Sequence, residues 1–166
     1  MPIEAVKTFS LRSIQSWVAG SSSEASQEIE QLFNCYEKVW FISIVDYGHP
    51  KIMLAAEDTI CFEFDDYDLQ TIGDFYDPEW EKFELASGPM FTAPEARRMI
   101  TFIERVHKDS RRGLLAVHCH AGVSRSGAVA KFVQETYKLN EDTFYKMNCN
   151  IEPNQFVLKL LKENLV

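Results

Sequence analysis

The sequence predicts a single α/β domain, spanning residues 1–166, with a mainly parallel central sheet flanked by helices. Three observations favour this fold class. The chain has 166 residues, which suits one domain and is too short for two ordinary ones. Apolar residues make up 46% of it, a globular composition. Segments that resemble buried strands alternate with segments of helical periodicity, and this alternation is typical of parallel strands joined by helices.

The first half of the chain holds two helix patterns followed by three strand patterns. The helices show apolar residues at spacings of three and four, whereas the strands are continuous or alternating apolar runs. The helices are expected at residues 10–17 and 24–36, and the strands at residues 39–45, 52–54 and 59–64. The turn residues DYGHP end the first strand, and the last strand leads directly into Asp65 and Asp66.

The second half begins with a capping box, Thr92-Ala-Pro-Glu95, which predicts the start of a helix. The apolar stripe of this helix continues to Val106, and Gly113 closes the segment. A buried strand and three helices follow, expected at residues 114–117, 124–138, 144–147 and 156–161. Asn154, which comes after a proline, is the predicted N-cap of the last helix.

Composition and charge argue against several classes of function. The formal charge is −8 and the basic clusters are short, so a protein dominated by nucleic-acid contacts is not expected. No apolar run has the length of a bilayer span, and the N-terminal residues lack the pattern of a secretory signal. The four cysteines form no C-x-x-C pair, so free thiols are expected. We therefore expect a cytoplasmic protein without a membrane or nucleic-acid partner.

The most informative segment joins the strand at 114–117 to the next helix and reads LLAVHCHAGVSRSG. Five residues separate Cys119 from Arg125 in it. Loop N–H groups and a helix N-terminus together bind anions, Gly122 allows backbone conformations without Cβ strain, and Arg125 can hold two phosphate oxygens. The same positive groups stabilise the thiolate of Cys119, which can then attack phosphorus. This mechanism requires neither a metal nor another cofactor.

The run HCHAGVSRSG resembles the signature loop of the protein-tyrosine phosphatase superfamily, His-Cys-x-x-Gly-x-x-Arg-Ser/Thr, at every fixed position. With each residue used about one time in twenty, a five-position match arises by chance about once per million positions or less. At pattern level the resemblance extends over residues 39–161, where ISIVD and FDDYD are similar to segments of compact dual-specificity enzymes from bacteria and phages. It implies a cysteine phosphatase that dephosphorylates proteins through a cysteinyl-phosphate intermediate.

The resemblance also assigns roles to the loop residues. Cys119 would be the nucleophile and Arg125 the phosphate clamp, while Ser126 would contact the sulfur and help the thiolate to leave in the second step. His118 would orient the loop by hydrogen bonding. It is not favoured as a proton donor, because neighbouring residues of a strand point to opposite faces. Backbone N–H groups around the phosphate would come from His120, Ala121, Gly122, Val123 and Ser124.

A general acid is needed on the far side of the phosphate to protonate the leaving oxygen. The face shared by Ile60, Phe62 and Phe64 continues to Asp66, which is therefore favoured. Asp65, Asp68 and a later aspartate stay open as alternatives. The spacing from Asp66 to Cys119 is longer than in minimal dual-specificity domains because of an insertion at residues 67–90. This insertion is interpreted either as a lid or recognition flap or as an extra surface helix.

Other interpretations of the loop fit less well. The run GVSRS lacks the final glycine of a serine-hydrolase elbow. A zinc site is disfavoured because strand alternation places Cys119 opposite its histidine neighbours, and a rhodanese-type sulfur carrier does not account for His118 or the Arg125-Ser126 pair. A catalytically weak phosphate-binding module of the same fold stays open.

The class of substrate is also open at this stage. Phosphotyrosine proteins lead, together with phosphoserine and phosphothreonine proteins. Non-protein phosphates such as phosphoinositides and RNA 5′-triphosphates rank lower. Enzymes for those substrates usually carry extra basic residues in or beside the loop, and this loop has only Arg125.

Overall fold

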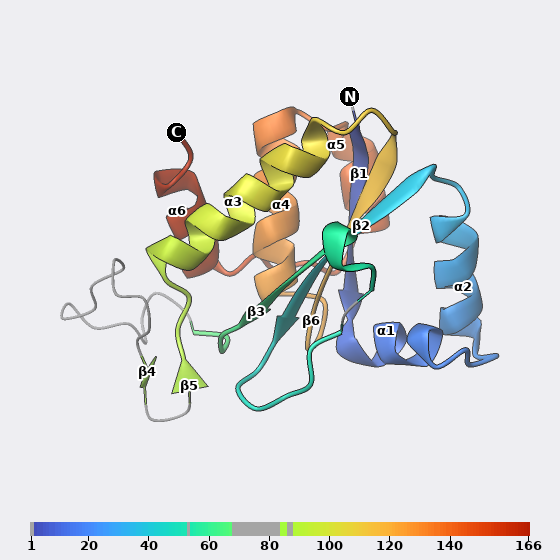
Figure 1. Ribbon diagram of the computed structural model, residues 1–166, viewed down its shortest axis with the longest axis horizontal. Coiled ribbons are helices and arrows are strands. Elements are labelled where there is room, and N and C mark those ends of the chain that lie inside the picture. The colour runs from blue at the N-terminus through green and yellow to red at the C-terminus, as the bar shows by residue number, and fades with distance from the viewer. Residues whose placement is uncertain (1, 53, 68–83, 86–87) are drawn as a thin grey trace.

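The computed structural model describes residues 2–52, 54–67, 84–85 and 88–166. At its centre lies a four-stranded sheet built from β1 (Ile3–Ser10), β2 (Lys38–Val45), β3 (Thr59–Glu63) and β6 (Gly113–Cys119). Every neighbouring pair of these strands is parallel, and their order is β1-β6-β2-β3. β6 therefore lies between β1 and β2, and all four strands end at the same edge (Figure 1).

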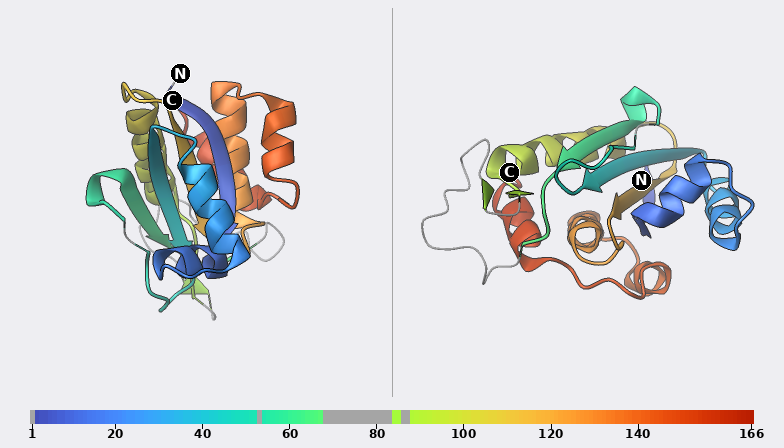
Figure 2. Two further views of the ribbon diagram at one scale, coloured as in Figure 1. Left: turned by 90° about the vertical axis from the view of Figure 1, so that its right-hand side faces the viewer. Right: turned by 90° about the horizontal axis from the view of Figure 1, so that it is seen from below.

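Helices flank the sheet in the described part of the chain. They are α1 (Leu11–Val18), α2 (Glu24–Phe33), α3 (Ala93–His107), α4 (Arg125–Tyr137), α5 (Glu141–Met147) and α6 (Gln155–Glu163). A 3-10 turn, η1 (Ala56–Asp58), precedes β3, and β4 (Glu84–Leu85) pairs antiparallel with β5 (Gly88–Pro89). Figure 1 and the right-hand view of Figure 2 agree that α1 and α2 lie at the opposite end of the molecule from α6.

A hydrophobic layer covers each face of the sheet. Phe41 packs with Ile14 of α1 and Ile29 of α2 on one face. Its neighbour Ile42 packs on the other face with the larger cluster to which α3, α4 and α6 contribute, including Val129. Successive residues of a strand point to opposite faces, so a strand buried on both faces has to be apolar throughout. The run VWFISIV meets this condition at every position except Ser43.

The predicted fold class, an α/β domain with a parallel sheet flanked by helices, is confirmed. The predicted cap residues are confirmed as well, since Thr92 caps α3 and Asn154 caps α6 through their side-chain oxygens. The second helix is shorter than predicted because it ends at Phe33. The strand predicted at residues 52–54 is wrong, since neither Ile52 nor Leu54 belongs to a strand.

The sequence interpretation also missed the first strand, β1. It lies at the edge of the sheet and pairs only with β6 among the described strands. The side chain of Asn148 covers its outer side: Oδ1 accepts a hydrogen bond from the Thr8 N–H at 2.9 Å, and Nδ2 donates to the Val6 carbonyl at 2.9 Å. One buried amide thus takes the place of a further strand and satisfies backbone groups that would otherwise be exposed at an edge.

A pH dependence of stability is expected from the capping box of α3. Glu95 accepts a hydrogen bond from the Thr92 hydroxyl at 3.1 Å, and burial raises the pKa of Glu95 from 4.5 to about 7, although Thr92 and Arg98 oppose the shift. The folded state therefore binds more protons than the unfolded state between these values. Its stabilising contribution is complete below about pH 4.5 and is lost as pH rises to about 7.

Glu95→Gln is expected to remove this dependence, because glutamine also fits the capping box but carries no charge. At pH 8 the variant should exceed the wild type in free energy of unfolding by on the order of 2 kcal/mol, with little difference at pH 5. Urea unfolding at both pH values measures the effect. Glu104→Gln, on the same helix, is the control. Equal pH slopes for wild type and Glu95→Gln would contradict the prediction.

Candidate active site

The predicted phosphate-binding loop connects β6 to α4 at the edge of the sheet where the parallel strands end. β6 ends at Cys119, and α4 begins at Arg125. The loop residues between them are His120, Ala121, Gly122, Val123 and Ser124. Cys119 is 2% exposed and Arg125 is 3% exposed, whereas the loop residues between them are more accessible. The structure therefore places the predicted nucleophile at the base of the loop and beside the start of a helix.

The loop is held against the junction of β1 and α1. The Leu11 N–H donates a hydrogen bond to the His120 carbonyl at 3.0 Å. Gly122 has a φ of +74°, and a Cβ at this position would lie 2.6 Å from the carbonyl carbon of Phe9. A larger residue would be both strained and in collision with backbone. The conformation of the loop therefore depends on the glycine of the motif and on its contact with β1.

The thiol of Cys119 has a hydroxyl within hydrogen-bond distance. Its Sγ lies 3.1 Å from Oγ of Ser126, which is fully buried in the first turn of α4. A hydroxyl in this position can donate to a thiolate and so stabilise its charge. The predicted pair of Cys119 and Ser126 is thus brought together.

Arg125 is anchored by groups that follow the neighbouring strands. Its Nη1 donates to Asp46 Oδ1 at 2.6 Å and to the Phe64 carbonyl at 2.7 Å. Asp46 follows β2 and Phe64 follows β3, so the guanidinium joins these strands to α4. Its buried Nε has no hydrogen-bond partner among the described residues. A phosphate oxygen would satisfy this donor, since buried N–H groups without a partner are rare in folded proteins.

Asp46→Asn is expected to lower kcat/KM for an aryl phosphate about tenfold, because asparagine keeps an acceptor for Arg125 but loses the charge that orients it. Asp46→Ala should cost more, about 10²-fold, since it leaves the buried guanidinium unpaired. Steady-state kinetics measure both, with Asp142→Asn on α5 as the control. Asparagine should therefore recover part of the activity that alanine loses. If both variants match the wild type, Asp46 does not position Arg125.

His118 lies at the back of the loop and is completely buried. Its Nδ1 lies 3.2 Å from the Cys119 carbonyl, which can only accept, so Nδ1 carries the proton. Its Nε2 lies 2.6 Å from Oγ of Ser43, which therefore donates. Burial lowers the pKa of His118, and Arg125 lowers it further, while the bond to the Cys119 carbonyl opposes the shift. The neutral ring thus links β6 to β2 and orients the backbone at Cys119.

The predicted general acid, Asp66, lies at the rim of the loop. Its Oδ1 accepts hydrogen bonds from Ser124 Oγ at 2.9 Å and from Asn154 Nδ2 at 2.7 Å. Asp65 makes a different contact: its Oδ1 accepts a hydrogen bond from the Tyr47 backbone N–H at 3.1 Å. Of these two candidates, Asp66 is the one that is hydrogen-bonded to the phosphate loop.

A cavity of about 370 Å³ lies where these acidic residues meet, lined by Asp46, Tyr47, Asp65, Asp66 and Tyr67. Tyr47 is 60% exposed at this cavity, whereas Tyr67 is buried. The third candidate acid, Asp68, lies outside the described residues, as does most of the insertion at 67–90. The described part of that insertion contributes the short β4–β5 pair, whose Pro89 carbonyl accepts a hydrogen bond from the Asp65 N–H at 2.8 Å.

Sequence reasoning missed two residues of this site and one role. Asp46 was taken as part of a turn, Ser43 as an ordinary residue of a buried strand, and Asn154 only as a helix cap. Ser43 carried a signal, because it is the one polar residue in the run VWFISIV. The partners of Asp46 and Asn154 lie far away in the chain, so no local spacing could have identified them.

Within the described residues, no group of His, Cys, Asp and Glu side chains is arranged to hold a metal ion. No helix in the same part of the chain has the length and apolar character needed to cross a membrane.

Three features of this site are typical of a cysteine-based phosphatase. They are a buried thiol at the end of a central parallel strand, a loop that enters a helix, and an arginine in the first turn of that helix. A family model described as protein-tyrosine phosphatase matches residues 26–153, well over half of the chain. The chain therefore belongs to the protein-tyrosine phosphatase family. No curated protein matches it significantly in sequence.

Proposed function

We propose that this protein is a metal-independent phosphatase that dephosphorylates phosphotyrosine proteins through a cysteinyl-phosphate on Cys119. The observation that carries the proposal is the arrangement around the thiol. Ser126 lies 3.1 Å from the sulfur, and Arg125 enters the same loop with a buried Nε that has no partner among the described residues. The nucleophile and the residue that would bind the phosphate anion thus lie at the two ends of the same loop.

In the first step, the Cys119 thiolate attacks phosphorus and forms the S–P bond while the bond to the leaving oxygen breaks. Arg125 and the loop N–H groups stabilise the charge on the other phosphate oxygens. Asp66, in its protonated form, gives its proton to the leaving phenoxide. Its contact with Ser124 supports this role, because it places the carboxyl group at the rim of the loop.

In the second step, water attacks phosphorus and the S–P bond breaks. Asp66, now a carboxylate, accepts a proton from the water. The thiolate of Cys119 leaves with the electron pair of the S–P bond and is stabilised by the Ser126 hydroxyl. The products are inorganic phosphate and the enzyme in its starting state.

The preference for aryl phosphates is supported by Tyr47 and Tyr67, which line the cavity beside the loop. An exposed aromatic ring such as Tyr47 offers a phosphotyrosine ring a stacking partner. Phosphoserine and phosphothreonine side chains are shorter and gain less from this contact. We therefore propose tyrosine as the preferred residue and the other two as poorer substrates.

A cytoplasmic location is part of the proposal. Cys35, Cys119 and Cys149 are free thiols in the described part of the chain, which suits a reducing compartment. Cys119 also has to stay reduced to act as a nucleophile.

The test is hydrolysis of p-nitrophenyl phosphate and of matched phosphotyrosine, phosphoserine and phosphothreonine peptides, each with and without EDTA. Activity unchanged by EDTA, with the phosphotyrosine peptide preferred, would support the proposal. No turnover by folded, reduced protein that still binds phosphate would identify the alternative, a phosphate-binding module. Turnover of the aryl ester without turnover of any peptide would favour a non-protein phosphate as substrate.

A further inference from the structure

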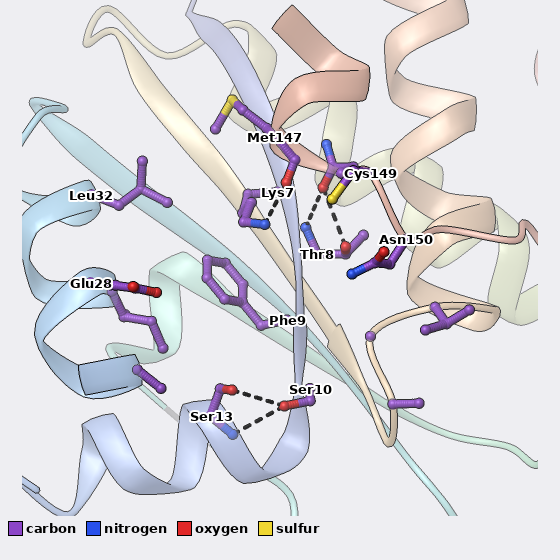
Figure 3. A pocket seen from close by; sticks show the side chains of 16 residues that line it. Lys7, Thr8, Phe9, Ser10, Ser13, Glu28, Leu32, Met147, Cys149 and Asn150 are labelled. Carbon is purple, nitrogen blue, oxygen red and sulfur yellow. Dashed lines mark hydrogen bonds between the residues drawn. The ribbon is translucent and has the colours of Figure 1, made fainter. Parts of the chain in front are cut away.

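A second cavity lies on the other side of β6 from Arg125 and Asp46, and the mechanism does not use it. Its volume is about 330 Å³. Five segments form its walls: the end of β1, Ser13 of α1, helix α2, residues 147–150 at and after the end of α5, and loop residues 121–123 (Figure 3). Because β1 and β2 flank β6 on opposite sides, this cavity adjoins the phosphate loop from the side away from the acidic residues.

Lys7 gives the cavity a half-buried positive charge. Its ammonium donates to the Met147 carbonyl and lies 5.7 Å from the centre of the Phe9 ring. No ion pair joins Lys7 to a carboxylate among the residues that the structure describes. Burial lowers the pKa of Lys7, although the nearby Cys149 and Glu28 oppose the shift. A partly desolvated ammonium that makes no direct ion pair gains from an anionic ligand that hydrogen-bonds to it.

The other walls restrict the rest of such a ligand. Phe9, Ile29 and Leu32 offer an apolar surface to its body, and Ser10 and Ser13 carry hydroxyls at the lower end of the cavity (Figure 3). Glu28 projects from α2 on the side opposite Lys7, so a second negative charge on the ligand would be repelled (Figure 3). These contacts favour a ligand that places one negative charge beside Lys7 and has an uncharged apolar body across the cavity.

We propose that this cavity binds a small organic monocarboxylate whose charge pairs with Lys7 and whose apolar body lies on Phe9 and Leu32. Its volume is in the range of small-molecule sites. The bound ligand would also touch the phosphate loop from outside, at Ala121 and Gly122. The loop conformation depends on the contact between Gly122 and Phe9, so occupancy of the cavity is transmitted to the groups that hold phosphate.

The test uses 3-phenylpropionate as the probe and 3-phenylpropanamide as its uncharged analogue, both titrated into the full chain while backbone amide shifts are recorded by NMR. Vanadate is kept saturating, so that the catalytic loop cannot bind the probe. The carboxylate should give saturable shifts at Ala121, Gly122 and Asn150 with a Kd of a few millimolar, roughly what its size allows. The amide should bind about tenfold more weakly or not detectably.

Two variants separate this site from other anion binding. Lys7→Gln should weaken the probe at least about tenfold, and Glu28→Gln should tighten it a few-fold by removing the opposing charge. Leu32→Trp, which fills the cavity, should abolish binding and replaces Lys7→Gln if that variant does not fold. The proposal is overturned if the amide binds as well as the carboxylate, if the shifts map to Asp46 and Asp66 instead, or if no saturable shift occurs.

Discussion

Cys119→Ser is expected to reduce hydrolysis of p-nitrophenyl phosphate by at least about 10⁴-fold while leaving phosphate binding intact. A serine hydroxyl at the base of the loop is a far weaker nucleophile than a thiolate. No other side chain of the loop offers a nucleophile that can replace the thiolate. The loop N–H groups and Arg125 remain, so the anion site persists. Steady-state kinetics and vanadate binding, measured on the same sample, separate the two properties.

Cys35→Ser is the matched control, because Cys35 is an exposed thiol outside the site and its replacement should leave the rate unchanged. Mass spectrometry of acid-quenched wild type should detect a phosphoryl group on Cys119. Comparable rates for Cys119→Ser and the wild type, in folded protein, would contradict the cysteinyl-phosphate mechanism. Loss of vanadate binding in the variant would show instead that the change disrupts the loop.

The loop could be predicted from the sequence because its chemistry is local. Cys119, Gly122, Arg125 and Ser126 lie within eight consecutive positions. Each has a physical reason for its place between a strand and a helix: the thiol ends the strand, the glycine takes a positive φ, and the last two lie in the first turn of α4. The spacing of these four residues along the chain was therefore enough to predict that their side chains lie close together.

The hydrogen-bond partners of Arg125 and His118 could not be predicted in this way. Asp46 meets Arg125, 79 positions later, only because β2 lies beside β6 in the sheet. Ser43 meets His118 for the same reason. The order of strands in a sheet is a long-range property that apolar patterns along the chain do not reveal. Such partners become visible only when the sheet is assembled.

Errors in predicting strands have the same origin. β1 contains Lys7 and Thr8, polar residues that weakened its pattern, and their hydrogen-bond partners are Met147 and Asn148, about 140 positions away. Ile52 is a β-branched residue typical of strands, but it pairs with no strand in the part of the chain that the structure describes. Its N–H instead donates to the Ser43 hydroxyl at 3.4 Å. Strand formation depends on a pairing partner as much as on the side chains themselves.

Asp66→Asn is expected to lower kcat about 10²- to 10³-fold for phenyl phosphate and much less for p-nitrophenyl phosphate. Phenoxide is a poor leaving group that needs a proton as the P–O bond breaks, whereas p-nitrophenolate leaves readily as an anion. Steady-state rates with both esters measure the effect.

Asp65→Asn is the matched control, since Asp65 differs from Asp66 by one position and is hydrogen-bonded to the Tyr47 backbone instead of the loop. A structural effect of Asp66→Asn, acting through Ser124 or Asn154, would slow both esters equally. The dependence on the leaving group thus distinguishes proton transfer from support of the loop. If Asp65→Asn produced that dependence and Asp66→Asn did not, the two assignments would have to be exchanged. If neither did, the acid would be Asp68 or a later aspartate of the insertion.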